Sequence, residues 1–118
     1  MRYLDLAISL ARQNPNCKWK LAAVGVKGGR VLSVAMNTFR QNPSPPGTIH
    51  YLDLGHHAET NCLHLSSTTP KTIYVARVNK KLEPALALPC PACYDALCQA
   101  GVRRVFFTTS TGYGELKL

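Results

Sequence analysis

The chain has 118 residues and carries 14 Lys and Arg residues against 6 Asp and Glu residues, which gives it a formal net charge of +8. This length fits one domain, and a hydrophobic content of 46% supports a buried core and excludes an intrinsically disordered chain. No apolar stretch approaches the roughly 18 residues of a membrane span, and residues 1–10 do not read as a secretory signal. The basic surplus indicates an anionic partner, although charge bears on association and solubility rather than on fold.

The N-terminal part is predicted to form a helix and a β-hairpin. Apolar residues recur at helical spacing over residues 2–13, and Asn14-Pro15 ends that pattern. Residues 21–27 and 30–36 are short apolar runs on either side of a Gly-Gly turn, which is typical of a hairpin. The Pro- and Gly-rich segment 37–55 predicts a long loop, and loops of that length in compact domains are usually functional.

The remaining segments predict helices that alternate with strands. A short helix is expected over residues 57–65, a strand over 72–78 and an irregular stretch over 79–88. A second helix over 91–100 and another strand over 102–108 follow, and the tail 110–118 has at most a short edge strand. Pro91 is suited to the first position of the second helix, and Gly101 to its end. This alternation favours an α/β layered sheet in one domain.

Cysteine usage points to a reducing compartment. The chain has five cysteines, an odd number, and no export signal, so we expect no disulfide framework and a cytoplasmic location. Cys17, Cys62 and Cys98 are interpreted as small buried hydrophobic residues or ordinary thiols. Cys90 and Cys93 form a C-x-x-C pair, which by itself is compatible with a metal site or a redox pair.

Two short motifs carry the chemistry, His57-Ala58-Glu59 and Pro89-Cys90-Pro91-Ala92-Cys93, each at the start of a predicted helix. One imidazole and two thiolates supply three ligands for tetrahedral Zn²⁺ and leave the fourth position to water. This is the pattern of a catalytic site, because structural zinc takes four protein ligands. The helix N-terminus favours the thiolate form of both cysteines. Glu59 is well placed to move the protons of the activated water.

H-x-E followed by P-C-x-x-C is the known signature of zinc-dependent nucleobase deaminases. From about Leu21 to Thr108, the chain resembles the cytidine and deoxycytidylate deaminase superfamily, in particular its small phage-type and metagenomic members. The first ligand is a histidine, His57, rather than a cysteine. In this respect the chain resembles the branch that holds the deoxycytidylate, tRNA-adenosine and AID/APOBEC-like deaminases. The resemblance implies one deaminase domain over residues 1–118 with a three-layer α/β/α fold. Its mixed sheet has about five strands with helices on both faces, and the C-terminal part after the fourth strand is shortened.

The resemblance also implies a role for each motif residue. One zinc ion per chain would be bound by His57, Cys90 and Cys93, and zinc-bound hydroxide would attack C4 of cytosine while Glu59 shuttles the proton. Three further substrate contacts are implied: the Asn37 side chain to the sugar, the Ala58 N–H to the base carbonyl, and the Leu88 C=O to the departing amine. A structural zinc knuckle or a non-catalytic zinc-binding module is the alternative, but it leaves Glu59 and the open ligand position without a purpose.

The net charge favours a polyanionic substrate, cytosine in single-stranded DNA, over free deoxycytidylate, with tRNA adenosine as a further alternative. The candidate contacts to that substrate are basic or aromatic residues in loops: Lys18, Trp19, Lys20, Arg40, His56 and Tyr113. Other interpretations stay open for the aromatic residues, because Trp19 could cover the edge of the core and Tyr113 could pack the tail.

Overall fold

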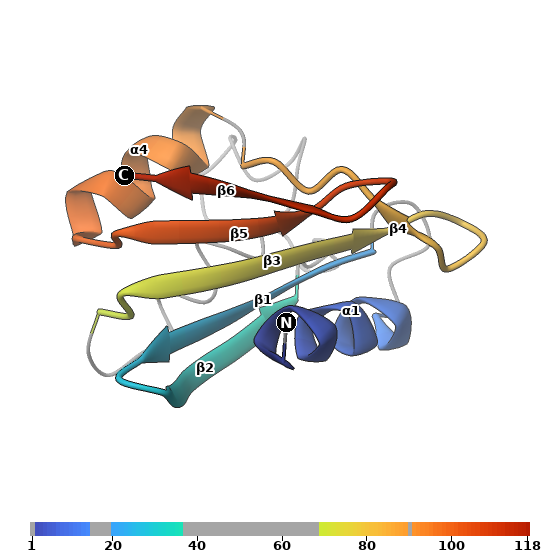
Figure 1. Ribbon diagram of the computed structural model, residues 1–118, viewed down its shortest axis with the longest axis horizontal. Helices are drawn as coiled ribbons and strands as arrows, with labels where there is room; N and C mark the ends of the chain where they lie inside the picture. Colours follow the sequence, from blue (N-terminus) through green and yellow to red (C-terminus); the bar gives the residue numbers. More distant parts are fainter. Residues whose placement is uncertain (1, 15–19, 37–68, 90) are drawn as a thin grey trace, which may run out of the picture.

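The computed structural model describes residues 2–14, 20–36, 69–89 and 91–118. A sheet of six strands crosses the molecule in the order β2-β1-β3-β5-β6, with β4 paired to β3 (Figure 1). The elements in chain order are α1 (Arg2–Gln13), β1 (Lys20–Lys27), β2 (Arg30–Met36), β3 (Thr72–Val78), β4 (Pro84–Ala85), α4 (Pro91–Ala100), β5 (Arg104–Thr108) and β6 (Tyr113–Lys117). The sheet is mixed, because β3 and β5 are parallel while the other pairs are antiparallel.

The predicted hairpin is confirmed, with β1 and β2 joined at the pair Lys27 and Arg30. The two turn residues, Gly28 and Gly29, have φ values of 59° and 77°. Two successive residues in the left-handed region give a turn whose twist matches that of the strands, and glycine adopts this conformation without steric cost. The Gly-Gly pair therefore fixes the pairing next to the turn, and the register shifts by one residue between Val26 and Gly25.

The helices lie on opposite faces of the sheet, as the α/β/α expectation requires. On one face, Ala7 and Ala11 of α1 pack with the buried side chains of β1 and β3. On the other face, Leu97 of α4 packs in a second cluster with Ile73 and Val105. Successive residues of a strand point to opposite faces, so the two clusters use alternate positions of the same strands. α1 makes its main contacts with β1 and β3, and in Figure 1 it lies in front of the sheet on the side of β1 and β2.

α4 begins at Pro91 as predicted and ends at Ala100, followed by Gly101 with a φ of 94°. It forms part of the crossover between β3 and β5, which parallel strands require. β5 begins at Arg104 rather than at the predicted residue 102, because the N–H groups of Arg103 and Arg104 both donate to the carbonyl of Lys71 ahead of the strand pairing.

Two short strands complete the sheet, and one of them, β4, raises the count from the expected five or so to six. β4 lies within the stretch 79–88 that was predicted to be irregular, and β6 in the tail is a strand of five residues on the edge of the described sheet. The predicted loop 37–55 and the predicted helix 57–65 lie outside the described residues. None of the helices described is long and apolar enough to span a bilayer.

Candidate active site

The first turn of α4 holds one of the predicted zinc ligands, Cys93. Pro91 occupies the first helical position, where its missing N–H would have had no intrahelical partner. Cys93, two residues further, is only 2% exposed. If Cys93 is a thiolate ligand, the burial of its charge is costly unless a cation compensates it, and the dipole of the helix start compensates only in part. The position therefore fits a zinc ligand.

The segment that leads into α4 is attached to the ends of β3 and β5 by the pairing of β4 and by the hydrogen bonds of one buried residue, Thr108. Thr108, with 0% exposure, donates its hydroxyl to the carbonyl of Ala85 at 2.7 Å and accepts the N–H of Arg77 at 3.1 Å. The Thr108 carbonyl also accepts the N–H of Ala87 at 3.0 Å. A single threonine thus links three backbone segments and fixes the course of the chain just before the P-C-x-x-C motif.

Leu88 lies on this fixed segment. Its neighbours Ala87 and Pro89 are buried, whereas the Leu88 side chain is 51% exposed. The side chain therefore contributes little to the core, and the immobilised main chain is the part of Leu88 that is suited to a site role. Its predicted contact through the carbonyl stays a prediction.

Lys20 begins β1 and is engaged within the protein. Its ammonium group donates to the carbonyl of Asn14 at 2.6 Å, and the side-chain amide of Asn14 donates to the carbonyl of Leu21 at 3.0 Å. Asn14 is only 2% exposed, so these bonds supply partners to polar groups that lie away from water. The structure thus shows Lys20 joining the end of α1 to the start of β1, and its predicted contact with substrate stays a prediction.

Tyr113 begins β6 and is 58% exposed. Its ring lies 6.3 Å from that of Phe106, which in turn stacks on Tyr74 at 5.1 Å between centroids. Tyr74 packs against the cluster under α1. Tyr113 therefore lies on the α1 face of the sheet, whereas Cys93 belongs to α4 on the other face, and the structure does not bring the two to one face.

The other predicted site residues lie outside the described part of the chain: Lys18, Trp19, Asn37, Arg40, His56, His57, Ala58, Glu59 and Cys90. Sequence reasoning missed the role of Thr108. Its only signal is a threonine at the end of an apolar strand, a residue type that strands favour on propensity alone.

The sequence matches the profile of the cytidine and deoxycytidylate deaminase zinc-binding region over residues 1–109. The chain belongs to this family. Zn²⁺ is accordingly its expected metal, and the buried cysteine at the start of α4 suits that ion. No curated protein matches the sequence.

Solved structures give the same fold. The deoxycytidylate (dCMP) deaminase of the cyanophage S-TIM5 in its apo form has 26% identity and a TM-score of 0.66, with 90% of this chain and 79% of that chain covered. The same phage enzyme in complex with dCMP and dUMP has 26% identity and a TM-score of 0.64, with 90% and 77% covered. The cytidine deaminase of Mycobacterium leprae has 15% identity and a TM-score of 0.59, with 97% and 90% covered, and supports the fold alone.

Proposed function

We propose that the protein is a zinc-dependent deaminase of the free nucleotide deoxycytidylate. The supporting observation is its likeness, at 26% identity over 90% of the chain, to a phage dCMP deaminase whose structure was solved with dCMP and dUMP. The sequence alone leaves free deoxycytidylate as the alternative, and this likeness makes it the main proposal in place of cytosine in single-stranded DNA. The net charge suits a nucleotide monophosphate as well, since one phosphate needs only a few cationic groups.

The proposed reaction converts dCMP and water to dUMP and ammonia. His57, Cys90 and Cys93 would hold Zn²⁺, which when bound lowers the pKa of water and makes a nucleophile available at neutral pH. Glu59 takes the proton of the water, delivers it to N3 of the base as C4 is attacked, and then carries a proton to the departing amine. The oxygen of the water becomes the O4 atom of uracil.

The described residues would contribute by positioning. The hydrogen bonds of Thr108 hold the main chain of residues 85–87, and α4 starts four residues later. Fixed main chain at this place would keep the Leu88 carbonyl and the first turn of α4 in one arrangement. Such preorganisation matters because small displacements of groups that orient the substrate reduce rates strongly.

A panel of substrates tests the proposal. The zinc-loaded protein is incubated with dCMP, deoxycytidine, a cytosine-containing oligonucleotide, its duplex and an adenosine stem-loop, and the products are separated by chromatography. We expect dUMP from dCMP and little uracil in the oligonucleotide. The matched control is Glu59→Ala, expected to fold, to keep its zinc and to lose turnover by at least about 100-fold. Uracil formed only in the oligonucleotide would overturn the free-nucleotide assignment, and retained activity of Glu59→Ala would overturn the role of Glu59.

A further inference from the structure

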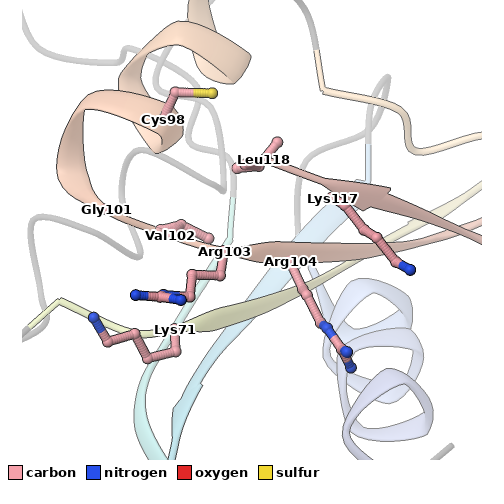
Figure 2. A pocket seen from close by; sticks show the side chains of 8 residues that line it. All are labelled: Lys71, Cys98, Gly101, Val102, Arg103, Arg104, Lys117 and Leu118. Atoms are coloured by element: carbon pink, nitrogen blue, oxygen red, sulfur yellow. The ribbon is translucent and has the colours of Figure 1, made fainter.

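Four cationic side chains gather where β3 and β5 begin, at the opposite end of α4 from Cys93. They line a hollow of about 650 Å³ beside Cys98 and Gly101 at the end of α4 (Figure 2). We call this group the basic end, and it consists of Lys71, Arg103, Arg104 and Lys117.

The main chain holds these residues next to one another. The Lys71 carbonyl accepts the N–H of Arg103 at 2.8 Å and the N–H of Arg104 at 3.2 Å. Arg104 is paired with Lys117 in the register of β5 and β6, and the N–H of Leu118 donates to the Arg103 carbonyl at 2.9 Å. The four cations are therefore fixed on adjacent backbone at strand ends.

This arrangement works against folding. Like charges directly opposite each other on neighbouring strands destabilise a sheet, and Arg104 and Lys117 form such a pair. Among the described acidic side chains, Glu115 alone forms an ion pair with the basic end, at 3.5 Å from Arg104. The carboxyl end of α4 favours nearby cations and offsets part of the repulsion. An anionic ligand would relieve the repulsion that remains between these cations.

The directions of the side chains indicate the shape of that ligand. In Figure 2, Lys71 and Arg103 extend to one side of the strands, whereas Arg104 and Lys117 extend to the other. They form a strip around the end of the sheet and do not converge on one point. Such a strip suits an extended chain of phosphates better than a single compact phosphate group.

An aromatic row continues this strip. Arg104 and Phe106 of β5 share one face with Tyr113, Glu115 and Lys117 of β6, because these residues occupy alternate positions of the two paired strands. The Glu115 carboxylate on this face is paired with Arg104. At the open end of the row, the Tyr113 ring is 58% exposed and leaves a surface against which a base can stack. Cations that follow a backbone and aromatic rings that stack with bases together characterise surfaces for single-stranded nucleic acid.

We propose that the basic end and Tyr113 bind single-stranded nucleic acid, at a surface separate from the candidate active site. The ten residues of α4 place the two ends of that helix about 15 Å apart. The proposal does not rest on the substrate of the deaminase, because the basic end lies at the other end of α4 from Cys93 and Tyr113 lies on the other face of the sheet.

Fluorescence anisotropy with a labelled oligothymidylate of about 20 nucleotides tests the cations, since this probe contains no cytosine for the active site. We expect the double variant Arg104→Gln/Lys117→Gln to weaken binding by about 10-fold or more. The salt slope, which is the slope of the logarithm of the binding constant against the logarithm of the salt concentration, should fall in magnitude by about 0.7 for each phosphate that is no longer neutralised. The matched control, Lys80→Gln/Lys81→Gln, removes two exposed cations at the far end of β3 and should change the affinity less than about 2-fold. Melting temperatures of both variants confirm that they are folded.

A second pair of variants tests the ring. Tyr113→Ala should weaken binding by about 5-fold or more with the salt slope unchanged, because the ring carries no charge, whereas Tyr113→Phe should bind as the wild type does. Absence of binding at low salt, an equal effect of both double variants, or stronger binding of a duplex would overturn the proposal. Competition by inorganic tripolyphosphate as effective as that by the oligonucleotide would indicate a compact phosphate site and would also overturn it.

Discussion

Cys93 is deeply buried and is a predicted zinc ligand, and a ligating thiolate carries a negative charge that the metal compensates. Its thiol is 2% exposed on the first turn of α4. Cys98 lies further along the same helix and is exposed. The two cysteines thus share a helix and differ in burial, so substitution of each by serine separates metal ligation from a general effect on α4.

We expect Cys93→Ser to lower zinc affinity by more than about 10-fold, because a ligand and its charge are removed. Cys98→Ser should keep one zinc per chain and the wild-type melting temperature. Elemental analysis and calorimetry provide the measurements. One equivalent of zinc in Cys93→Ser after dialysis would contradict the ligand role.

Tyr74 links stability to alkaline pH. Burial raises the pKa of the Tyr74 phenol above its ordinary value of 10.0, the neighbouring Tyr3 raises this pKa further, and Arg104 lowers it. The unfolded chain therefore loses this proton at lower pH than the folded protein does. The stability contributed by the protonated phenol is complete below pH 10 and is lost as pH rises through the folded pKa.

Urea unfolding between pH 8 and about pH 11 should therefore show a smaller alkaline loss of stability in Tyr74→Phe than in the wild type. Tyr94→Phe, which changes a tyrosine on the surface of α4, serves as the matched control. Identical pH profiles of Tyr74→Phe and the wild type would show that Tyr74 is not the group responsible.

Among the elements, the short strand β4 and the main chain after it depend on β3 and β5. β4 has two residues and pairs with β3 at Arg77 and Val78. The hydrogen bonds of Thr108 extend this attachment to Ala85 and Ala87. The sheet thus holds the segment that leads into α4. This segment itself lacks a backbone N–H group at Pro84 and at Pro89.

Thr108→Val should cost about 1–3 kcal/mol, because valine has a similar shape but can neither accept the N–H of Arg77 nor donate to the carbonyl of Ala85. Thr72→Val, at the half-buried start of β3, is the control and should change stability by less than about 0.5 kcal/mol. Urea unfolding measures both. A loss in Thr108→Val no larger than that in Thr72→Val would show that the hydroxyl is not essential to this attachment.

At the scale of the whole molecule, the predicted metal site connects distant parts of the chain. His57 precedes β3 in the sequence and Cys93 follows it. A zinc ion bound by both would therefore connect two segments that β3 separates along the chain. Metal binding of this kind contributes directly to folding free energy.

Removal of zinc by a chelator should lower the melting temperature by about 10 °C or more, as expected for a ligand present at about 100 times its Kd or above. Addition of Zn²⁺ should restore it. Differential scanning calorimetry with parallel metal analysis is the measurement. A protein that melts at the same temperature with and without its zinc would contradict this linkage.

The sequence by itself determined the elements whose signals are local. Helical spacing with Asn14-Pro15 predicts α1, the Gly-Gly pair predicts the hairpin, and Pro91 with Gly101 bounds α4. The strand 72–78 agrees with its prediction residue for residue, because its β-branched and aromatic side chains fit a buried pleated surface. The two motifs also sufficed for the family, since His57, Glu59, Cys90 and Cys93 are spaced along the chain in a pattern that family members share.

Only the tertiary structure decided what depends on distant residues. It placed β5 parallel to β3, fitted β4 against the end of β3, and brought the Thr108 hydroxyl to the main chain before α4. It also gathered the basic end from residues 71, 103, 104 and 117, which appear in the sequence only as scattered positive charges. Strand order and side-chain clusters follow from packing between segments far apart in the chain, whereas turns, caps and periodicity follow from neighbouring residues.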